Sequence, residues 1–234
     1  MRAEPASASQ GCDCSGDDHW PGHVCTPAWL ARVPGIRFVA RYLSLRAAPQ
    51  EVPDDHGGDH AGCYSLSRLE IEWILGAGKA LIPVQWGSVG GDVLGPELGY
   101  QRGAQAAVQA LGLGLPDGAH LWCDFEGARA RAAGADACRQ YLEAWSMVVC
   151  GAGFRAGLYV GDDSVPLHGT ALYALPLYTS YWGSVPAKRA EFMRPVPRDW
   201  AIRQSPPSTV EGLSVDRDEI VMDGKGETPW WVVA

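Results

Sequence analysis

The chain has 234 residues and a formal net charge of −8, with 47% hydrophobic and 20% charged residues. This composition supports a folded core, and the negative charge argues against nucleic acid as a partner. No apolar run approaches the roughly 20 residues of a membrane span. The opening residues lack the apolar core of a secretory signal, so the sequence predicts no export route.

Eight short apolar runs, rich in β-branched residues, predict strands that alternate with helices. They cover residues 11–14, 36–43, 80–86, 120–126, 155–160, 175–181, 200–204 and 214–220. Such alternation favours parallel pairing through right-handed crossovers. The prediction is a compact α/β protein, a (β/α)8 TIM-like barrel. We expect a flexible leader over residues 1–9 and a single domain over residues 10–234.

Three helices are predicted from the spacing of their apolar residues. Ser67 and Glu70 have capping-box spacing at the start of the first. The residues expected to share a face are Leu66, Leu69, Trp73 and Ala77 in the first helix, Ala104, Ala107, Val108 and Leu111 in the second, and Tyr141, Leu142, Trp145 and Val149 in the third. Gly112 is placed to end the second helix, and Asp136 and Gly151 to bound the third. Segments 162–173 and 184–199 have little periodicity, so their helices are expected to be short or irregular.

Carboxylates recur near the ends of the predicted strands. Asp13 ends the first strand, Asp124 and Glu126 end the fourth, and Asp216 and Asp218 lie on the last. The C-terminal ends of barrel strands converge on one mouth, where active sites are built. Since the first and last strands become neighbours when the barrel closes, Asp13 and Asp216 are expected to lie close together.

Asp124 and Glu126 are spaced i, i+2, so both side chains should leave the same face of their strand. Their Cα atoms would be about 6.6 Å apart. Two carboxylates this close cannot both ionise freely. Glycosidic cleavage needs a proton donor and a second carboxylate that stabilises the cation-like sugar or positions water. Glu126 has the longer reach and is the predicted general acid, with Asp124 or Asp216 as stabiliser or base.

Other polar and aromatic residues end the predicted strands and are expected to line the mouth. Aromatic faces suit sugar rings, and amides suit hydroxyl groups. The residues expected to bind substrate are Arg41, Tyr42, Gln85, Trp86, Tyr159, Trp182, Gln204 and Asp218. Arg41 would neutralise the carboxylates, although a surface salt bridge of little energetic weight is its simpler role. Ordinary rim packing is the simpler role for the others.

Two segments could hold a metal ion, but neither has an ordered ligand pattern. The first offers Cys12, Cys14, His19, His23 and Cys25, and the second is the acidic loop at 54–60. Neither fits a standard zinc or calcium spacing, so a polar loop is the preferred interpretation and no metal or cofactor is predicted. Cysteines 123, 138 and 150 fall in predicted strand and helix, where buried thiols are expected.

Five short elements occur in a recognisable order. They are Gly11-Cys-Asp13, Ala80-Leu-Ile-Pro-Val-Gln-Trp86, Leu121-Trp-Cys-Asp-Phe-Glu126, Gly153-Phe-Arg-Ala-Gly-Leu-Tyr159, and Trp200-Ala-Ile-Arg-Gln204 followed by Val215-Asp-Arg-Asp218. Together they span most of residues 10–222. In this order they resemble the glycoside-hydrolase-like TIM-barrel family known as domain of unknown function 1906, which is related to the family 25 lysozymes.

The resemblance implies a barrel whose acidic site holds Asp13, Asp124, Glu126 and Asp216. Cys12 stands where the family has an aromatic residue, and the closing Trp-Gln-Tyr is loosened in this chain. Both departures bear on the substrate more than on the fold.

The sequence therefore predicts a monomeric glycoside hydrolase that cleaves an amino-sugar polymer, peptidoglycan above all. A non-catalytic glycan-binding barrel is the alternative, in which the acids would only hydrogen-bond sugar hydroxyls. A metal-dependent hydrolase is a third hypothesis, and it predicts that a chelator removes the activity.

Overall fold

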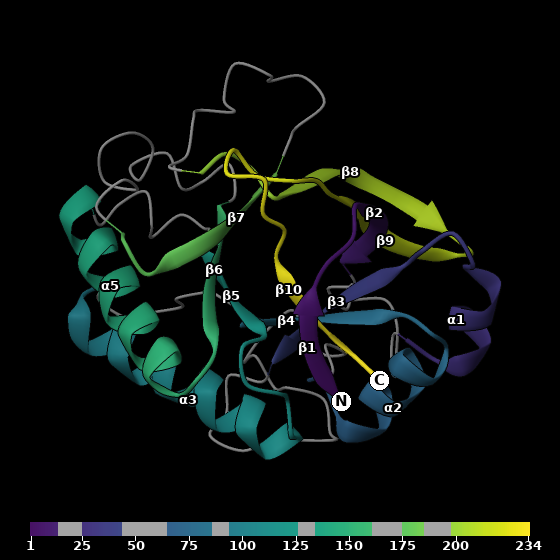
Figure 1. The fold of residues 1–234 in the computed structure, drawn as a ribbon, viewed down its shortest axis with the longest axis horizontal. Helices are drawn as coiled ribbons and strands as arrows, with labels where there is room; N and C mark the ends of the chain where they lie inside the picture. The colour runs from purple at the N-terminus through teal and green to yellow at the C-terminus, as the bar shows by residue number, and fades with distance from the viewer. Residues whose placement is uncertain (14–24, 44–64, 86–93, 126–133, 161–174, 185–197) are drawn as a thin grey trace.

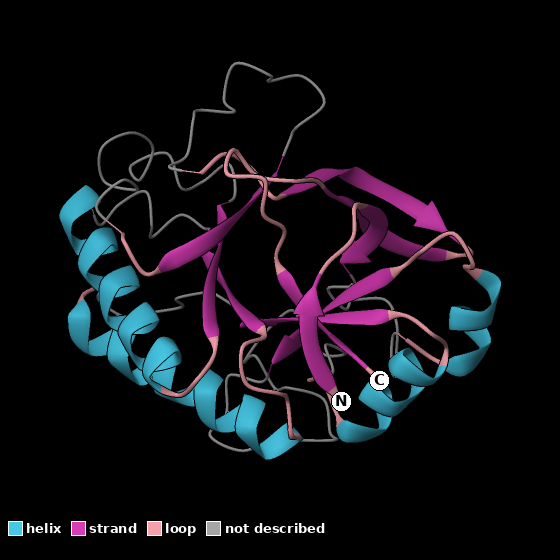
Figure 2. Cartoon of the chain, viewed as in Figure 1, coloured by secondary structure: helices cyan, strands magenta, loops and turns pink. Residues whose placement is uncertain are grey.

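The computed structural model describes residues 1–13, 25–43, 65–85, 94–125, 134–160, 175–184 and 198–234. In this part of the chain, eight strands close into a barrel, with helices on its outside (Figures 1 and 2). The barrel strands are β2 (Ser9–Asp13), β3 (Phe38–Leu43), β4 (Ala80–Gln85), β5 (His120–Phe125), β6 (Arg155–Val160), β7 (Tyr178–Ser184), β8 (Ile202–Val210) and β9 (Leu213–Ile220). The predicted α/β barrel is confirmed.

The strands pair in chain order, but one of them runs the other way. Strands β2 to β8 pair parallel with one another, whereas β9 is antiparallel to both β8 and β2. The expectation of parallel pairing throughout is therefore wrong for β9. The reason is a two-residue turn at Glu211 and Gly212, whose φ angles of 50° and 82° are both positive. Positive φ at both central residues is typical of a tight hairpin, which forces antiparallel pairing.

Alternate residues of each strand fill the barrel lumen. The inner hydrophobic cluster includes Phe38, Val84, Trp122, Trp182 and other inward-facing residues. Trp122 lies across its neighbouring strand at Gly157, where an added Cβ would approach the indole ring to 2.6 Å. The lumen is therefore a packed core, as in other small barrels.

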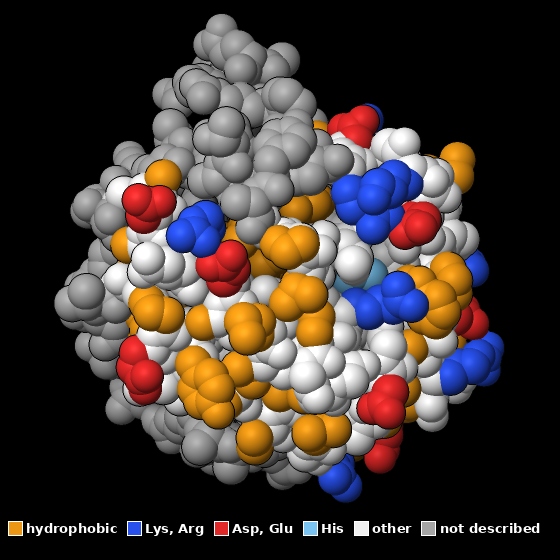
Figure 3. Space-filling view, turned by 60° about the vertical axis from the view of Figure 1, so that its left-hand side comes forward, with side chains coloured by type: hydrophobic (Ala, Val, Ile, Leu, Met, Phe, Trp, Pro, Cys, Tyr) orange, Lys and Arg blue, Asp and Glu red, His pale blue; other side chains and the backbone are white. Residues whose placement is uncertain are grey.

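The outward-facing residues form a second core under the helices of the described chain, which are α1 (Pro27–Arg32), α2 (Arg68–Gly76), α3 (Pro96–Leu113) and α5 (Ala135–Gly151). Helices α3 and α5 lie on one side of the barrel, and α1 and α2 on the other (Figure 1). None of these helices is both long and apolar enough to cross a membrane. On the face turned forward in Figure 3, exposed hydrophobic side chains form several separate patches.

Two of the three predicted helical faces need correction. Helix α2 buries Glu70, Ile71, Ile74 and Leu75, so the predicted face containing Leu69, which is 44% exposed, is wrong. In α3 the glycine that ends the helix is Gly114, and Val108 and Leu111 are exposed. The predicted face of α5 is confirmed, although Gly134 precedes the helix as its cap and Asp136 does not.

A two-stranded ribbon lies at the end of the barrel where the parallel strands begin. Strands β1 (Arg2–Pro5) and β10 (Trp230–Val233) pair antiparallel, and β10 pairs with β4 at Leu81. Strand β5 pairs with β4 only at Val84 and Gln85, so β10 fills the space between these strands at their starts. The prediction of a flexible leader is wrong for residues 2–5, because their backbone groups are paired in this ribbon.

His120 fastens the ribbon to the barrel. Its Nδ1 accepts a hydrogen bond from the backbone N–H of Trp230 at 2.8 Å, and its Nε2 lies 2.9 Å from Thr179 Oγ1. Burial is the main cause that lowers the pKa of His120 to about 3. The ring is therefore neutral, and with Nδ1 accepting, its proton is on Nε2 and donated to Thr179.

Candidate active site

Asp13 and Asp216 lie side by side at the mouth of the barrel. Asp13 is the last residue of β2, and Asp216 is its direct partner on β9. The expected closeness of these two acids is therefore confirmed, although they approach from antiparallel strands. Asp13 is buried, with 4% of its surface exposed, whereas Asp216 is half-buried. Of the two, Asp216 is the more accessible from outside.

Asp218 lies one layer deeper on the same inner face of β9. It is opposite Gly11 of β2 on one side and Gln204 of β8 on the other, and it is 1% exposed. Trp182 Nε1 donates a hydrogen bond to Asp218 Oδ1 at 3.0 Å. Asp218 was expected to bind substrate, but the structure places it beneath the mouth, where a substrate cannot reach it.

Asp124 lies on the opposite wall of the lumen. It belongs to the inward-facing set of β5 with Trp122, is 3% exposed, and pairs in register with Tyr159. In the strand order, β5 is three strands from β2 and four from β9. The predicted general acid Glu126 and the predicted rim residue Trp86 lie outside the described residues.

Three hydrogen-bonding side chains join this acidic group from β3, β6 and β8. Tyr42 donates its hydroxyl proton to Asp13 Oδ2 at 3.2 Å. Tyr159 donates to Gln204 Oε1 at 2.8 Å. Tyr42 is half-buried, while Tyr159 and Gln204 are buried. The structure thus places all three on the inner face of the barrel; that they line a substrate-binding mouth stays a prediction.

Arg41 and Gln85 face away from the lumen. Arg41 is 1% exposed and pairs with Glu70 of α2, with Nε 2.8 Å from Oε1. Gln85 donates to the backbone oxygen of Arg102 at 2.6 Å and accepts from Trp145 Nε1, which ties β4 to α3 and α5. The structure therefore does not bring either residue to the mouth, because odd-numbered residues of β3 and β4 point outward.

Burial and like charges set the protonation of the acids on β9. Burial raises the pKa of Asp216. Burial and, next, the negative charges of Asp13 and Asp216 raise the pKa of Asp218 well above its usual range. Hydrogen bonds from Trp182 and from the backbone of Asp13 act in the opposite direction. A group of carboxylates with unequal pKa values can hold a proton at neutral pH, as acid catalysis requires.

Two residues have roles that were not anticipated, one inside the lumen and one outside the barrel wall. Trp122 lies two residues before Asp124 on the inner face of β5 and packs edge-on against Trp182, with ring centroids 5.6 Å apart. Its spacing of two residues from Asp124 could have indicated that it lies on the same inner face. Glu70 appeared in the sequence only as a capping residue, yet it also holds Arg41 and accepts from the backbone N–H of Cys25 at 3.3 Å. No spacing rule could have indicated this second role.

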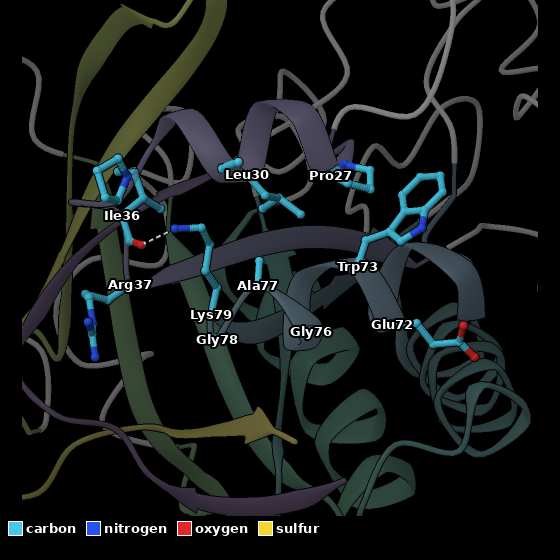
Figure 4. Close-up of a pocket in the computed structure, with 12 residues that line it drawn as sticks. Pro27, Leu30, Ile36, Arg37, Glu72, Trp73, Gly76, Ala77, Gly78 and Lys79 are labelled. Atoms are coloured by element: carbon cyan, nitrogen blue, oxygen red, sulfur yellow. Dashed lines mark hydrogen bonds between the residues drawn. The ribbon is translucent and has the colours of Figure 1, made fainter.

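A cavity of about 570 Å³ lies elsewhere, between α1 and α2 (Figure 4). Its lining includes Leu30, Trp73 and Lys79, and Lys79 Nζ donates to the backbone oxygens of Val33 and Ile36, each at 2.7 Å. None of the acids described above lines it. We therefore place the candidate active site at the mouth, where the aspartates gather, and not in this cavity.

Four of the five cysteines that the structure describes are buried, and Cys150 is partly buried against the core. Cys12 and Cys25 lie in the outer hydrophobic core, while Cys14, His19, His23 and the loop at 54–60 lie outside the described residues. Within the described ranges, no group of His, Cys, Asp and Glu is arranged to hold a metal ion. Cys123 is buried on β5, and burial raises its pKa, so it is a poor nucleophile.

Solved structures share this fold at low sequence identity. The Mycobacterium tuberculosis Tat-secreted protein Rv2525c, solved with HEPES, is 17% identical, with a TM-score of 0.65 over 94% of this chain and 98% of that one. An uncharacterised B. stearothermophilus protein is 20% identical, with a TM-score of 0.61 over 91% and 96%. A bacterial lysozyme from Streptomyces coelicolor is 14% identical, with a TM-score of 0.57 over 92% and 93%.

No curated protein sequence matches this chain. A family model does match, and it covers residues 28–218, which include all the barrel strands except β2 and the end of β9. This chain belongs to the Rv2525c-like, glycoside hydrolase-like domain family.

Proposed function

We propose that this protein is a glycoside hydrolase that cleaves an amino-sugar polymer, with peptidoglycan as its substrate. The observation that carries the proposal is the convergence of aspartates from β2, β5 and β9 on one end of the lumen. A lysozyme and a muramidase are among the proteins that share the fold. Since their identity to this chain is 14% and 11%, they support the fold, and the acids support the chemistry.

The proposed mechanism divides the acids by their position. Glu126 follows Asp124 at i, i+2 and is the proposed general acid that protonates the leaving oxygen. Asp216 is half-buried at the mouth. We assign it the role of positioning water or stabilising the cation-like sugar. Asp124 and Asp13 are almost fully buried and supply negative charge from opposite walls. An N-acetyl group on the substrate could take part as an internal nucleophile, as in substrate-assisted enzymes.

Tyr42, Tyr159 and Gln204 are proposed to complete the sugar-binding mouth. Tyr42 holds Asp13 through its hydroxyl group, and Tyr159 is fixed by Gln204. Trp86 is proposed as a stacking residue at the rim. The Rv2525c structure is described as that of a Tat-secreted protein, and a peptidoglycan-cleaving role for this chain would likewise require export.

The decisive experiment compares wild type with Glu126→Gln on purified peptidoglycan. We expect the wild type to release reducing ends and soluble muropeptides, measured by mass spectrometry, and the variant to lose roughly 100-fold or more in rate. Glu219→Gln is the matched control, because Glu219 is exposed on β9 and points away from the lumen. Full activity of Glu126→Gln would overturn the assignment of the acid.

Two other outcomes would identify the alternative functions. If wild type and Glu126→Gln both sediment with peptidoglycan and neither releases fragments, the protein is a glycan-binding barrel. If a chelator abolishes the activity and elemental analysis finds stoichiometric metal, it is a metal-dependent hydrolase. Either result would contradict the proposed mechanism.

A further inference from the structure

Asp218 occupies an unusual position for a carboxyl group. It is 1% exposed, and its strand places it between Gly11 and Gln204 in the middle of the lumen. Trp182, which is also 1% exposed, covers it from β7. A group enclosed in this way cannot touch the substrate directly. Its effect on the reaction must act through its neighbours.

The hydrogen bonds of Asp218 favour one of its oxygens. Oδ1 accepts from Trp182 Nε1 at 3.0 Å, and the backbone of Asp13 also hydrogen-bonds to this carboxyl group. Among the described residues, none forms a hydrogen bond with Oδ2, which is buried. An ionised carboxylate has several lone pairs to satisfy on both oxygens, and leaving them unsatisfied in a buried site is costly. A neutral acid has the smaller desolvation cost and can donate a hydrogen bond from Oδ2.

The charges nearest to Asp218 are negative. Those that act on it from the described chain are the carboxylates of Asp13 on β2 and Asp216 on its own strand. Facing groups on β7 and β8, Trp182 and Gln204, carry no charge. A third negative charge here would be repelled by both carboxylates in a medium of low dielectric constant. A neutral carboxyl avoids this repulsion, because it carries no charge.

We propose that Asp218 is a positioning residue that works in its neutral, protonated form and leaves the negative charge of the mouth to Asp13 and Asp216. The proposal rests on the proposed function, since a glycosidase needs that charge beside the cation-like sugar. Ionised Asp218 would force one of its two neighbours to take up a proton. The mouth would then have less negative charge at the position where the sugar binds.

The protonation of Asp218 can be observed without substrate. A protonated carboxylic acid has a C=O stretching band in the infrared that an ionised carboxylate lacks. We expect the difference spectrum between wild type and Asp218→Asn at neutral pH to contain this band. Asp223→Asn is the matched control, because Asp223 is also buried but is ion-paired with Arg198 at 2.8 Å. The control spectrum should show no such loss.

The functional part of the test compares two substitutions at the same position. Asparagine can accept from Trp182 and, like the neutral acid, carries no charge, whereas alanine cannot accept that hydrogen bond. We expect Asp218→Asn to keep the rate within about threefold of wild type and Asp218→Ala to lose roughly tenfold or more. The wild type should also lose activity at alkaline pH as Asp218 ionises, and Asp218→Asn should lack that decline.

Two results would overturn the proposal: a wild-type difference spectrum without the carboxylic acid band, or an Asp218→Asn variant as impaired as Asp218→Ala. If the wild type cleaves nothing, the proposed function has failed. The affinity of the same three proteins for cell-wall fragments then replaces the rate, and the infrared band is unaffected. The two failures are therefore distinguishable.

Discussion

Arg41 and Tyr42 are adjacent in the sequence, yet they lie on opposite sides of the barrel wall. Tyr42 points into the lumen and holds Asp13, whereas Arg41 points outward and pairs with Glu70. Both lie near the end of the predicted strand at 36–43, and both were expected at the mouth. Alternation along a strand allows only one of them to be there. Because β3 and β4 are buried on both faces, hydrophobicity does not show which set of residues faces inward.

The acids were easier to predict than the polar residues around them. Asp13, Asp124 and Asp216 share the inner face because each follows its strand's alternation, and their spacing carries this information. Asp218 has the same alternation, but its depth depends on how far β9 extends past β2. That register is set by pairing between distant segments and is absent from any local pattern.

The raised pKa of Asp218 predicts a pH-dependent stability. The folded state keeps the proton that the unfolded chain releases near its ordinary pKa, so the free energy of unfolding falls as pH rises above about 4. The slope from this group is about 1.4 kcal/mol per pH unit while the native carboxyl stays protonated. Asp218→Asn should lack this contribution. Urea denaturation of both proteins from pH 4 upward measures it, and parallel curves would contradict it.

The buried Arg41–Glu70 pair predicts an asymmetric response to mutation. Glu70→Ala removes the buried carboxylate that pairs with the guanidinium of Arg41 and should lower the free energy of unfolding by about 3–5 kcal/mol. The double variant Arg41→Met, Glu70→Met should lose less. The control is the surface pair Arg139–Glu143, where Glu143→Ala should cost under about 0.5 kcal/mol. Equal losses at the two pairs in denaturant titrations would refute the expectation.

Whole elements were predicted with more success than their orientations. Each of the eight predicted strands overlaps an observed one, because short β-branched runs separate clearly from helical spacing. The reversal of β9 was missed, since the signal is only Glu211-Gly212 between two polar strands. Helix α2 buries a different face from the predicted one, because the charged residue Glu70 is buried in an ion pair with Arg41.

Helices α3 and α5 cross where two glycines of α3 lie against the backbone of α5. This close contact predicts that a larger side chain at the crossing destabilises the fold. A Cβ at Gly99 would lie 2.1 Å from the backbone oxygen of Tyr141, which cannot move without bending α5. Gly99→Ala should therefore lower the free energy of unfolding by about 1–3 kcal/mol despite alanine's better helix propensity. Gly76→Ala is the control, because its Cβ would meet nothing within 4 Å. Thermal unfolding that ranks the two variants the other way would refute the close crossing.

At the scale of the whole molecule, the two ends of the barrel differ: one is closed by a side chain, and the other holds the acids. Trp231 plugs the closed end within the inner cluster, with its ring 6.2 Å from that of Phe38. Its neighbour Trp230 lies outside, beneath the guanidinium of Arg155 at 4.3 Å. The ribbon was not predicted: residues 1–9 contain no apolar run, and the short apolar run of β10 is a strand signal that was missed. Its stability comes from pairing two segments over 220 residues apart in the chain.

Because Trp231 fills the closed end, we expect alanine substitutions at the two adjacent tryptophans to differ greatly in their effect on the free energy of unfolding. Trp231→Ala should open a cavity in the lumen and lower the free energy of unfolding by about 3–5 kcal/mol. Trp230→Ala removes mainly a surface cation–π contact and should cost about 1 kcal/mol or less. Guanidinium denaturation of both variants provides the measurement. If both cost the same, Trp231 is not a core residue.

The pairing of β1 with β10 also sets where anything attached to this barrel would emerge. Arg2 lies opposite Val233, and its guanidinium donates to the backbone oxygen of Ala234 at 2.8 Å. Segments joined before residue 1 or after residue 234 would therefore leave from the end opposite the acids and would not cross the mouth. For the same reason, a short linker between the two ends should yield circular permutants that fold, with new termini cut into a surface connection.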